Sequence, residues 1–250
     1  MTDLTGKVAV VTGSARGIGK AVALRYASLG ARVVVNYFGD DQVAGSTVAE
    51  CRAAGGEAIA VKADVSKVED IERLYRSTRE QFGRIDIVVA NAGFEIVDQP
   101  VLEATEEQFD RIFAVNTKGA FFTLQKGAKY VADGGRLILI GSSSTASPVP
   151  GTGLYSSSKM AARQLVRVLA AEMIERSVTV NTILPAPTDG AGVFTDLAQD
   201  APEHEFFARI RFGQRLGRPD DVADAAEYFA GDLASYVSGQ SLLLSGGAIV

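Results

Sequence analysis

The amino-acid sequence predicts a single-domain, doubly wound α/β fold in which helices cover both faces of a parallel sheet. Seven short runs rich in β-branched and other apolar residues alternate with longer amphipathic segments, the pattern of repeated strand–helix–strand units. Of the 250 residues, 47% are hydrophobic, enough to bury one large core. No linker or composition break divides residues 1–250 into two domains.

The strands are predicted from continuous apolar runs, which are typical of strands buried on both faces. Residues 7–12, with the sequence KVAVVT, and residues 31–36, with the sequence ARVVVN, form the first two strands. The later strands are predicted at residues 57–62, 85–90, 135–140, 178–184 and 241–245. Because helical segments separate these runs, we expect right-handed crossovers and a parallel sheet.

The helices are predicted between the strands, with glycines at several of their ends. Gly30 is expected to end the first helix as a C-cap, and Gly55 and Gly56 the second. The predicted helices cover about residues 17–29, 42–54, 67–81, 105–132, 154–175 and 220–230. Within 105–132, Asn116 is a poor helix-interior residue, so it either binds an inserted water or caps a kink.

Charge and cysteine content exclude several classes of partner. The net charge of −5 and the pI near 5.1 disfavour nucleic acid or an anionic membrane held by bulk electrostatics. The single cysteine, Cys51, excludes an intramolecular disulfide and fits a reducing compartment. No export signal and no run of about 18 apolar residues is recognisable. We therefore expect a cytoplasmic protein with no nucleic-acid, membrane or metal partner.

A glycine-rich turn directly follows the first predicted strand. Its spacing, Gly-x-x-x-Gly-x-Gly over Gly13 to Gly19, differs from the common Gly-x-Gly-x-x-Gly fingerprint. Glycines let the backbone turn tightly and approach a diphosphate, and the following helix offers free N–H groups and a positive dipole end. The turn therefore predicts a dinucleotide site, with a merely tight strand–helix turn as the alternative.

The pattern that most clearly indicates catalytic chemistry is Tyr155-x-x-x-Lys159, preceded by Ser142. Residues four apart on a helix share one face, and a nearby ammonium lowers the pKa of a phenol. A loop containing prolines and glycines separates Ser142 from Tyr155 and can bring the serine hydroxyl back beside the tyrosine. Ser143 is the rival for the serine position.

Together these motifs resemble the short-chain dehydrogenase/reductase family over essentially the whole chain. The residues that carry the resemblance are Thr12 to Gly19, Asp64, Asn91-Ala92-Gly93, Asn116, Ser142, Tyr155 and Lys159. The resemblance implies a Rossmann-type sheet of about seven strands in the order 3-2-1-4-5-6-7, a nicotinamide cofactor and interconversion of a carbonyl and an alcohol.

The family mechanism implies a role for each catalytic residue. Tyr155 is the general acid that protonates the carbonyl oxygen, and Lys159 lowers its pKa and binds the nicotinamide ribose. Ser142 polarises the carbonyl, and Asn116 holds a water that links Lys159 to solvent. The implied cofactor contacts are Gly13, Ser14, Arg16, Gly17, Ile18, Gly19, Asn36, Tyr37, Asp64, Val65, Asn91, Ala92, Gly93, Tyr155, Lys159, Pro185, Ala186 and Thr188. Ala186 departs from the glycine that the family often has there.

The residues after the second strand indicate NADP(H) rather than NAD. A carboxylate there would bind a ribose 2′-hydroxyl and repel a 2′-phosphate, but this chain has Asn36 and Tyr37. Arg16 in the glycine turn can pair with a phosphate, and members of the family with these residues typically prefer NADP. Asp40 and Asp41 oppose this interpretation if either turns inward.

The substrate and the assembly are less determined. Residues 189–215, which are rich in phenylalanine, correspond to a substrate lid in the resembling family, and loop residues such as Phe94 and Ile96 suggest an apolar or aromatic ketone. The alternatives are a 3-oxoacyl-carrier-protein reductase, an aromatic polyketide reductase or a non-catalytic dinucleotide sensor. Related enzymes pair two long helices, so a homotetramer is expected. We expect the outer faces of those helices to carry Phe121, Phe122, Leu165, Val166, Val168 and Leu169.

Overall fold

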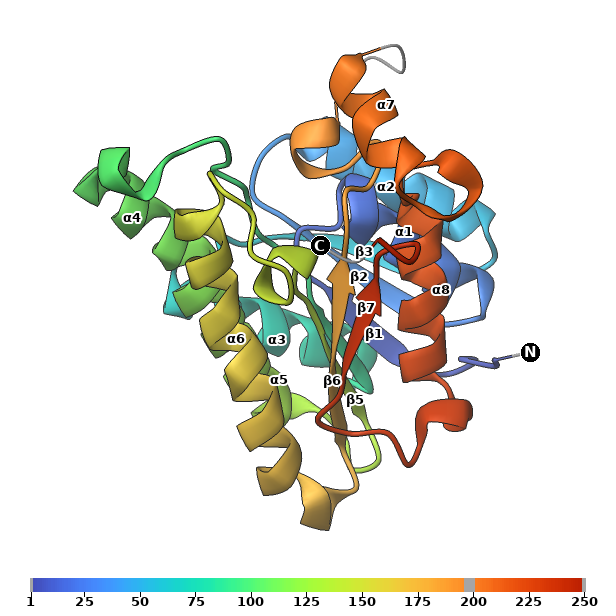
Figure 1. The fold of residues 1–250 in the computed structure, drawn as a ribbon. Coiled ribbons are helices and arrows are strands. Elements are labelled where there is room, and N and C mark those ends of the chain that lie inside the picture. Colours follow the sequence, from blue (N-terminus) through green and yellow to red (C-terminus); the bar gives the residue numbers. More distant parts are fainter. Residues whose placement is uncertain (1, 196–200, 249–250) are drawn as a thin grey trace.

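The computed structural model, which describes residues 2–195 and 201–248, contains one seven-stranded parallel sheet (Figure 1). The strand order is β3-β2-β1-β4-β5-β6-β7, which confirms the predicted topology. The strands are β1 (Val8–Val11), β2 (Arg32–Tyr37), β3 (Glu57–Lys62), β4 (Ile87–Ala90), β5 (Arg136–Ile140), β6 (Thr179–Pro185) and β7 (Ser241–Leu244). The predicted strands agree with these to within two residues at each end.

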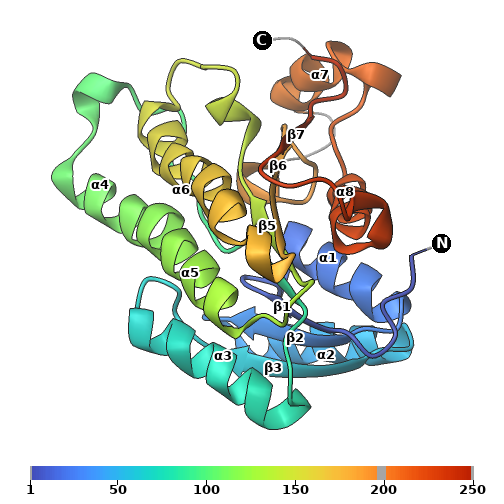
Figure 2. The ribbon, with the colours of Figure 1, turned by 90° about the horizontal axis from the view of Figure 1, so that it is seen from below.

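The helices cover both faces of this sheet. They are α1 (Gly17–Ser28), α2 (Asp41–Ala53), α3 (Val68–Phe82), α4 (Glu106–Phe113), α5 (Ala120–Tyr130), α6 (Gly153–Glu172), α7 (Pro202–Arg209) and α8 (Pro219–Ala230). Figure 2 shows α1 and α8 on one side of the central strands and α5 and α6 on the other. Among the described residues, no helix is both long and apolar enough to cross a membrane.

The two faces of the sheet hold separate cores because successive strand residues point in opposite directions. In β1, Ala9 and Val11 pack with α1, α2 and α8, whereas Val8 and Val10 pack with α3, α5 and α6. All four residues of β1 are buried. This double burial explains why the strand is a continuous apolar run rather than an alternating one.

The helix predicted over 105–132 is interrupted in the structure. Its middle, Ala114–Gly119, is π-helical and joins α4 to α5. The side-chain amide of Asn116 bonds to the backbone of Phe94 and to Ser158 Oγ, and Thr117 Oγ1 donates to the carbonyl oxygen of Ser158. The Asn116 and Thr117 side chains thus bond to segments outside their own helix. π-helical turns are common at functional sites.

The expectation that six apolar residues lie on the outer faces of the long helices is mostly wrong. Val166 and Leu169 are buried in the core, and Phe122 and Leu165 are partly buried against it. Phe121 and Val168 are exposed, at 41% and 46%. Four of the six side chains therefore belong to the core under α5 and α6 rather than to an outer face.

The predicted lid follows β6 and begins with two glycines in the left-handed region of the backbone. Gly190 and Gly192 have φ angles of +68° and +57°, a conformation that side chains other than glycine rarely adopt. The following helix, α7, carries Phe206 at 56% exposure, and Phe212 just beyond it is 87% exposed. These phenylalanines are therefore not packed on the sheet. Residues 196–200 of the predicted lid lie outside the described residues.

Candidate active site

The glycine turn packs directly against the loop that follows β4. A Cβ added to Gly19 would lie 2.5 Å from both Asn91 Nδ2 and the carbonyl oxygen of Gly13. Asn91 Nδ2 donates to the carbonyl oxygens of Thr12 and Gly13, at 2.8 and 3.1 Å. Only a glycine at position 19 allows this approach, so the helix that starts at Gly17 is held tightly to the ends of β1 and β4.

The start of α1 has no side-chain cap. Arg16, the N-cap residue, has an exposed side chain and makes no capping hydrogen bond. Ser14 is buried and its Oγ donates to the carbonyl oxygen of Val11 at 2.7 Å, so it shapes the turn from inside. Ile18 packs on the core. Backbone N–H groups at a helix start, next to a cation, are suited to a diphosphate.

The side chain of Asn36 is buried and forms its hydrogen bonds within the protein. It is 1% exposed, and its Oδ1 accepts from the N–H of Gly13 at 3.1 Å. Its Nδ2 donates to the carbonyl oxygens of Val61 and Ala63 at 3.2 and 3.1 Å. The side chain thus ties the glycine turn to β3, which the sequence did not indicate, and its contact with a ribose stays a prediction.

The two carboxylates after β2, Asp40 and Asp41, interact with neighbouring groups of the protein. Asp40 caps α2 by accepting from the N–H groups of Gln42 and Val43, and Asp41 forms a 2.8 Å ion pair with Lys62. The same lysine lies over the ring of half-buried Tyr37. The carboxylates that could repel a 2′-phosphate are therefore partly neutralised by their own neighbours.

The turn after β3 holds two of the predicted cofactor contacts, Asp64 and Val65. Asp64 is partly buried, and its Oδ1 accepts from the N–H and Oγ of Ser66 at 3.0 and 2.8 Å. Val65 is 7% exposed and packs in the core. The Asp64 carboxylate thus stabilises its own turn, as Asx residues commonly do.

Tyr155 and Lys159 lie side by side on α6. Both side chains are buried, with exposures of 6% and 7%. Lys159 Nζ lies 5.9 Å from the centroid of the Tyr155 ring and donates a long, 3.5 Å hydrogen bond to the carbonyl oxygen of Ile140 at the end of β5. The predicted pair therefore occupies the carboxyl edge of the sheet, where ligands bind in doubly wound folds.

Burial governs the proton affinities of this pair. It raises the pKa of Tyr155, and the Glu95 carboxylate raises it further, whereas a hydrogen bond with Ser142 lowers it. Burial also lowers the pKa of Lys159 to about 8, against the raising effect of Glu95. Burial outweighs the hydrogen bond from Ser142, because loss of hydration destabilises the phenolate more than that bond stabilises it. The lowering of the tyrosine pKa by Lys159 stays a prediction.

Ser142 is brought to this pair by the turn after β5. It is 8% exposed, and its Oγ lies 2.9 Å from Ser144 Oγ. The same Oγ caps the short 3-10 turn Ser143–Thr145 by accepting from the N–H of Ser144 at 3.2 Å. Ser142 therefore presents a hydroxyl beside Tyr155, as its sequence position suggested.

Asn116 and Gly93 line the opposite side of Lys159. A Cβ added to Gly93 would lie 2.7 Å from Lys159 Nζ and 2.9 Å from Asn116 Oδ1. Gly93 is exposed, so the backbone next to the ammonium is open to a ligand. Both polar atoms of the Asn116 side chain bond to the backbone of Phe94, and the water relay predicted through Asn116 stays a prediction.

Three further predicted cofactor contacts lie at and just after the end of β6. Pro185, Ala186 and Thr188 line a cavity of about 150 Å³. Thr188 is 5% exposed, and its Oγ1 donates to the carbonyl oxygen of Ala186 at 2.8 Å. Ala186 is partly exposed, and its contact with the cofactor stays a prediction.

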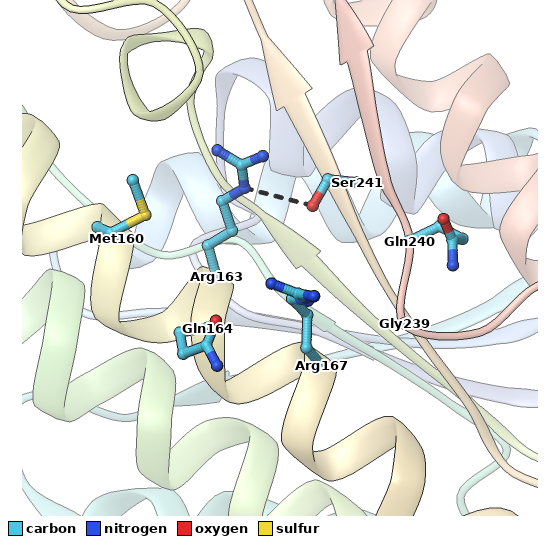
Figure 3. A pocket seen from close by; sticks show the side chains of 7 residues that line it. All are labelled: Met160, Arg163, Gln164, Arg167, Gly239, Gln240 and Ser241. Carbon is cyan, nitrogen blue, oxygen red and sulfur yellow. Dashed lines mark hydrogen bonds between the residues drawn. The ribbon is translucent and has the colours of Figure 1, made fainter.

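A separate pocket of about 390 Å³ lies between α6 and the start of β7 (Figure 3). Arg163 links this pocket to Ser142: its Nη1 donates to the carbonyl oxygen of Thr145 at 2.7 Å, and Thr145 Oγ1 donates to that of Ser142 at 2.7 Å. The pocket is lined by Met160, Arg163, Gln164, Arg167, Gly239, Gln240 and Ser241. Sequence reasoning missed Arg163, although its position four residues after Lys159 places it on the same helix face.

These residues fit a dinucleotide. The glycine turn leaves no space for side chains at Gly13 and Gly19, the helix start at Gly17 is uncapped, and Lys159 faces the open backbone of Gly93. Such a close backbone approach, together with a cation and a helix N-terminus, is what a diphosphate and a ribose require.

Comparisons with known proteins agree with this geometry. A protein-family model described as Enoyl-(Acyl carrier protein) reductase matches residues 13–248. The hydroxynaphthalene reductase-like protein Arp2 of Metarhizium brunneum is 38% identical, over 99% of this chain and 96% of that protein. The chain belongs to the short-chain dehydrogenase/reductase family.

Two solved structures resemble it closely. The promiscuous reductase LugOII, which catalyses keto-reduction at C1 during lugdunomycin biosynthesis, has a TM-score of 0.91 and 36% identity, with both chains fully covered. The angucycline C-6 ketoreductase LanV, solved with bound NADP, has a TM-score of 0.91 and 33% identity, over 99% of this chain and 97% of that one. The fold and the oxidoreductase class are therefore shared across the whole chain.

Proposed function

We propose that this protein is an NADP(H)-dependent ketoreductase that converts a ketone reversibly into a secondary alcohol. The observation that carries the proposal is the burial of Tyr155 beside Lys159, with Ser142 close enough to hydrogen-bond the tyrosine. Tyr155 can donate a proton, Lys159 supplies a cation and the Ser142 hydroxyl can polarise a carbonyl. All three lie at the edge of the sheet that also carries the glycine turn.

The chain's own residues supply positioning and proton transfer. The cofactor, when bound, supplies the hydride to the carbonyl carbon. Ser142 Oγ donates a hydrogen bond to the carbonyl oxygen and stabilises the developing alkoxide. Tyr155 Oη then transfers its proton to that oxygen, and its raised pKa keeps it protonated, as reduction requires. Lys159, with a pKa near 8, is mostly an ammonium at neutral pH and stabilises the phenolate left behind.

Replacing Tyr155 by Phe tests this mechanism. NADPH oxidation is followed by absorbance with polycyclic aromatic ketones, simple ketones, β-ketoesters, a β-ketoacyl thioester and an enoyl thioester. Wild type should oxidise NADPH with at least one ketone, and the variant should lose about 100-fold or more of the turnover while binding NADPH equally well. Undiminished turnover in the variant would contradict the role of Tyr155. NADPH binding without turnover of any compound would instead indicate a sensor.

The preference for NADP(H) rests on the charges around the second strand. No carboxylate occupies the end of β2, Asp41 is paired with Lys62, and the exposed guanidinium of Arg16 stands at the start of α1. LanV has bound NADP, which supports this assignment. Initial rates with NADPH and NADH at equal, sub-saturating concentration test it; equal rates, or faster rates with NADH, would contradict it.

A polycyclic aromatic ketone is the proposed substrate. Phe94 and Ile96 pack against the cluster that contains Tyr155, so apolar side chains lie near the reacting groups. Arp2 is described as hydroxynaphthalene reductase-like, LugOII as a reductase that acts at C1 in lugdunomycin biosynthesis, and LanV as an angucycline C-6 ketoreductase. The family description, which names an acyl carrier, supports the second candidate, a 3-oxoacyl thioester, and the substrate panel distinguishes the two.

We also propose a homotetramer. Phe121 on α5 and Val168 on α6 are exposed, and Leu242 and Leu243 on the edge strand β7 are 37% and 40% exposed. An unpaired edge strand with apolar side chains is a typical site of subunit contact. Light scattering at micromolar concentration should give four times the chain mass of 26.3 kDa.

A further inference from the structure

Glu95 is a carboxylate in an otherwise apolar part of the candidate active site. It belongs to the loop after β4, between Phe94 and Ile96, both of which pack in the cluster that contains Tyr155. Asn116 holds this loop by bonding to both backbone polar groups of Phe94. The position of the carboxylate is therefore set by the same asparagine that lies beside Lys159.

Glu95 also contacts the segment that follows β6. Its Oε2 accepts a hydrogen bond from the N–H of Val193 at 3.0 Å, at the start of the short 3-10 turn Gly192–Phe194. A Cβ added to Gly192 would lie 2.7 Å from the same oxygen. The carboxylate thus lies flat against the glycine backbone and caps this turn across 98 residues of sequence.

The carboxylate acts on the reacting pair as well. Besides burial, it is the group that raises the pKa of Tyr155, and it opposes the lowering of the pKa of Lys159. Ser142 also forms a hydrogen bond with Tyr155, and Lys159 Nζ lies 5.9 Å from the centroid of the tyrosine ring. Glu95 is therefore the anionic member of this group.

We propose that Glu95 is a positioning residue for the reaction. It holds residues 189–195 against the loop after β4, next to Tyr155. Its hydrogen bond to Val193 fixes where the segment after β6 begins, and that segment borders the space in which a ketone meets Tyr155. Its charge adds to the effect of burial in favouring the protonated phenol of Tyr155. The kinetic consequences rest on the proposed ketone reduction, whereas the tie between the two segments does not.

Two substitutions separate the hydrogen bond from the charge. Glu95→Gln keeps an oxygen acceptor for Val193 but removes the charge, and Glu95→Ala removes both. Glu103→Gln, an exposed carboxylate in the same stretch of chain, is the control. The circular dichroism spectrum and the unfolding temperature of each variant establish that it folds.

The first readout is hydrogen exchange of a peptide covering residues 189–195, which needs no turnover. Loss of a hydrogen bond to a charged group typically changes the local opening equilibrium on the order of tenfold. Glu95→Ala should raise exchange in this peptide on the order of tenfold, and Glu95→Gln and Glu103→Gln should raise it much less. Unchanged exchange in folded Glu95→Ala would overturn the tie.

The second readout is the pH profile of ketone reduction. Removing a negative charge lowers the pKa of Tyr155, so the alkaline limb, where the proton donor is lost, should move to lower pH in both Glu95 variants but not in Glu103→Gln. Glu95→Ala should also raise KM more than Glu95→Gln does. An unmoved alkaline limb in Glu95→Gln would overturn the electrostatic part. If wild type reduces no ketone, the proposed function fails, and the exchange experiment still decides the tie.

Discussion

Asn116 and Phe94 are joined by a pair of hydrogen bonds that connects the middle of a helix to an active-site loop. Asn116 Nδ2 donates to the carbonyl oxygen of Phe94 at 2.9 Å, and its Oδ1 accepts from the N–H of Phe94 at 3.1 Å. Because one amide satisfies both backbone groups, the loop after β4 cannot move without breaking both bonds. The π-helical turn at Asn116 is the backbone distortion that makes this pairing possible.

Replacing Asn116 by Ala should weaken both the fold and the reaction. The Phe94 backbone and Ser158 would lose their partner, and a buried polar group left without a hydrogen bond costs about 1–3 kcal/mol. We expect the free energy of unfolding to fall by that amount and kcat to fall more than NADPH affinity. Chemical denaturation and steady-state kinetics measure these effects, and an unchanged stability would show that the pair is dispensable.

Replacing Gly19 by Ala should abolish NADPH binding. The added methyl group would lie 2.5 Å from Asn91 Nδ2 and from the Gly13 carbonyl oxygen, so the glycine turn would have to shift. Gly45→Ala in α2 is the control, since nothing lies within 4 Å of a Cβ there and a helix-interior alanine should add up to about 1 kcal/mol of stability. Fluorescence titration with NADPH compares the two, and binding by Gly19→Ala would contradict the tight approach.

Replacing Lys159 by Met should remove turnover but stabilise the fold at neutral pH. Burial lowers the pKa of Lys159 from 10.5 to about 8, so between these values the unfolded chain binds more protons and the stability contributed by this group rises with pH. Below pH 8 the buried ammonium lowers the free energy of unfolding of the wild type by a constant amount, and the variant lacks this ammonium. The excess stability of Lys159→Met should therefore be largest at pH 7 and shrink toward pH 10. Urea unfolding of both proteins at several pH values measures it, and a gap that widens with pH would contradict this account.

Replacing Arg163 by Met should lower kcat without changing NADPH affinity. The guanidinium supports Thr145, which in turn bonds to Ser142, so its loss should loosen the serine turn and reduce turnover about tenfold, as expected for a slightly misplaced polar group. Arg167→Met, in the same pocket one turn along α6 (Figure 3), is the matched control. Equal effects of the two substitutions would mean that general charge, rather than support of Ser142, is responsible.

Local patterns in the sequence were sufficient for the strands, for most of the helices and for the residues that the structure brings together at one edge of the sheet. Apolar runs such as residues 8–11 are legible because strands buried on both faces must be apolar throughout. The glycine turn and the Tyr155–Lys159 spacing are legible because backbone approach and helix periodicity are properties of neighbouring residues. The prediction of a continuous helix over 105–132 was wrong. The interruption at Asn116 accompanies its pairing with Phe94, which lies 22 positions away in the sequence and is not a local pattern.

By itself, the sequence determined that the chain is a doubly wound oxidoreductase domain with a tyrosine, a lysine and a serine at one sheet edge. Only the tertiary structure decided how these groups are tuned. Burial raises the pKa of Tyr155, Asn36 braces the glycine turn, and Glu95 meets Val193 beside the reacting pair. The physical reason is that solvent exclusion and contacts between distant segments exist only once the chain has folded, whereas spacing and composition are present before.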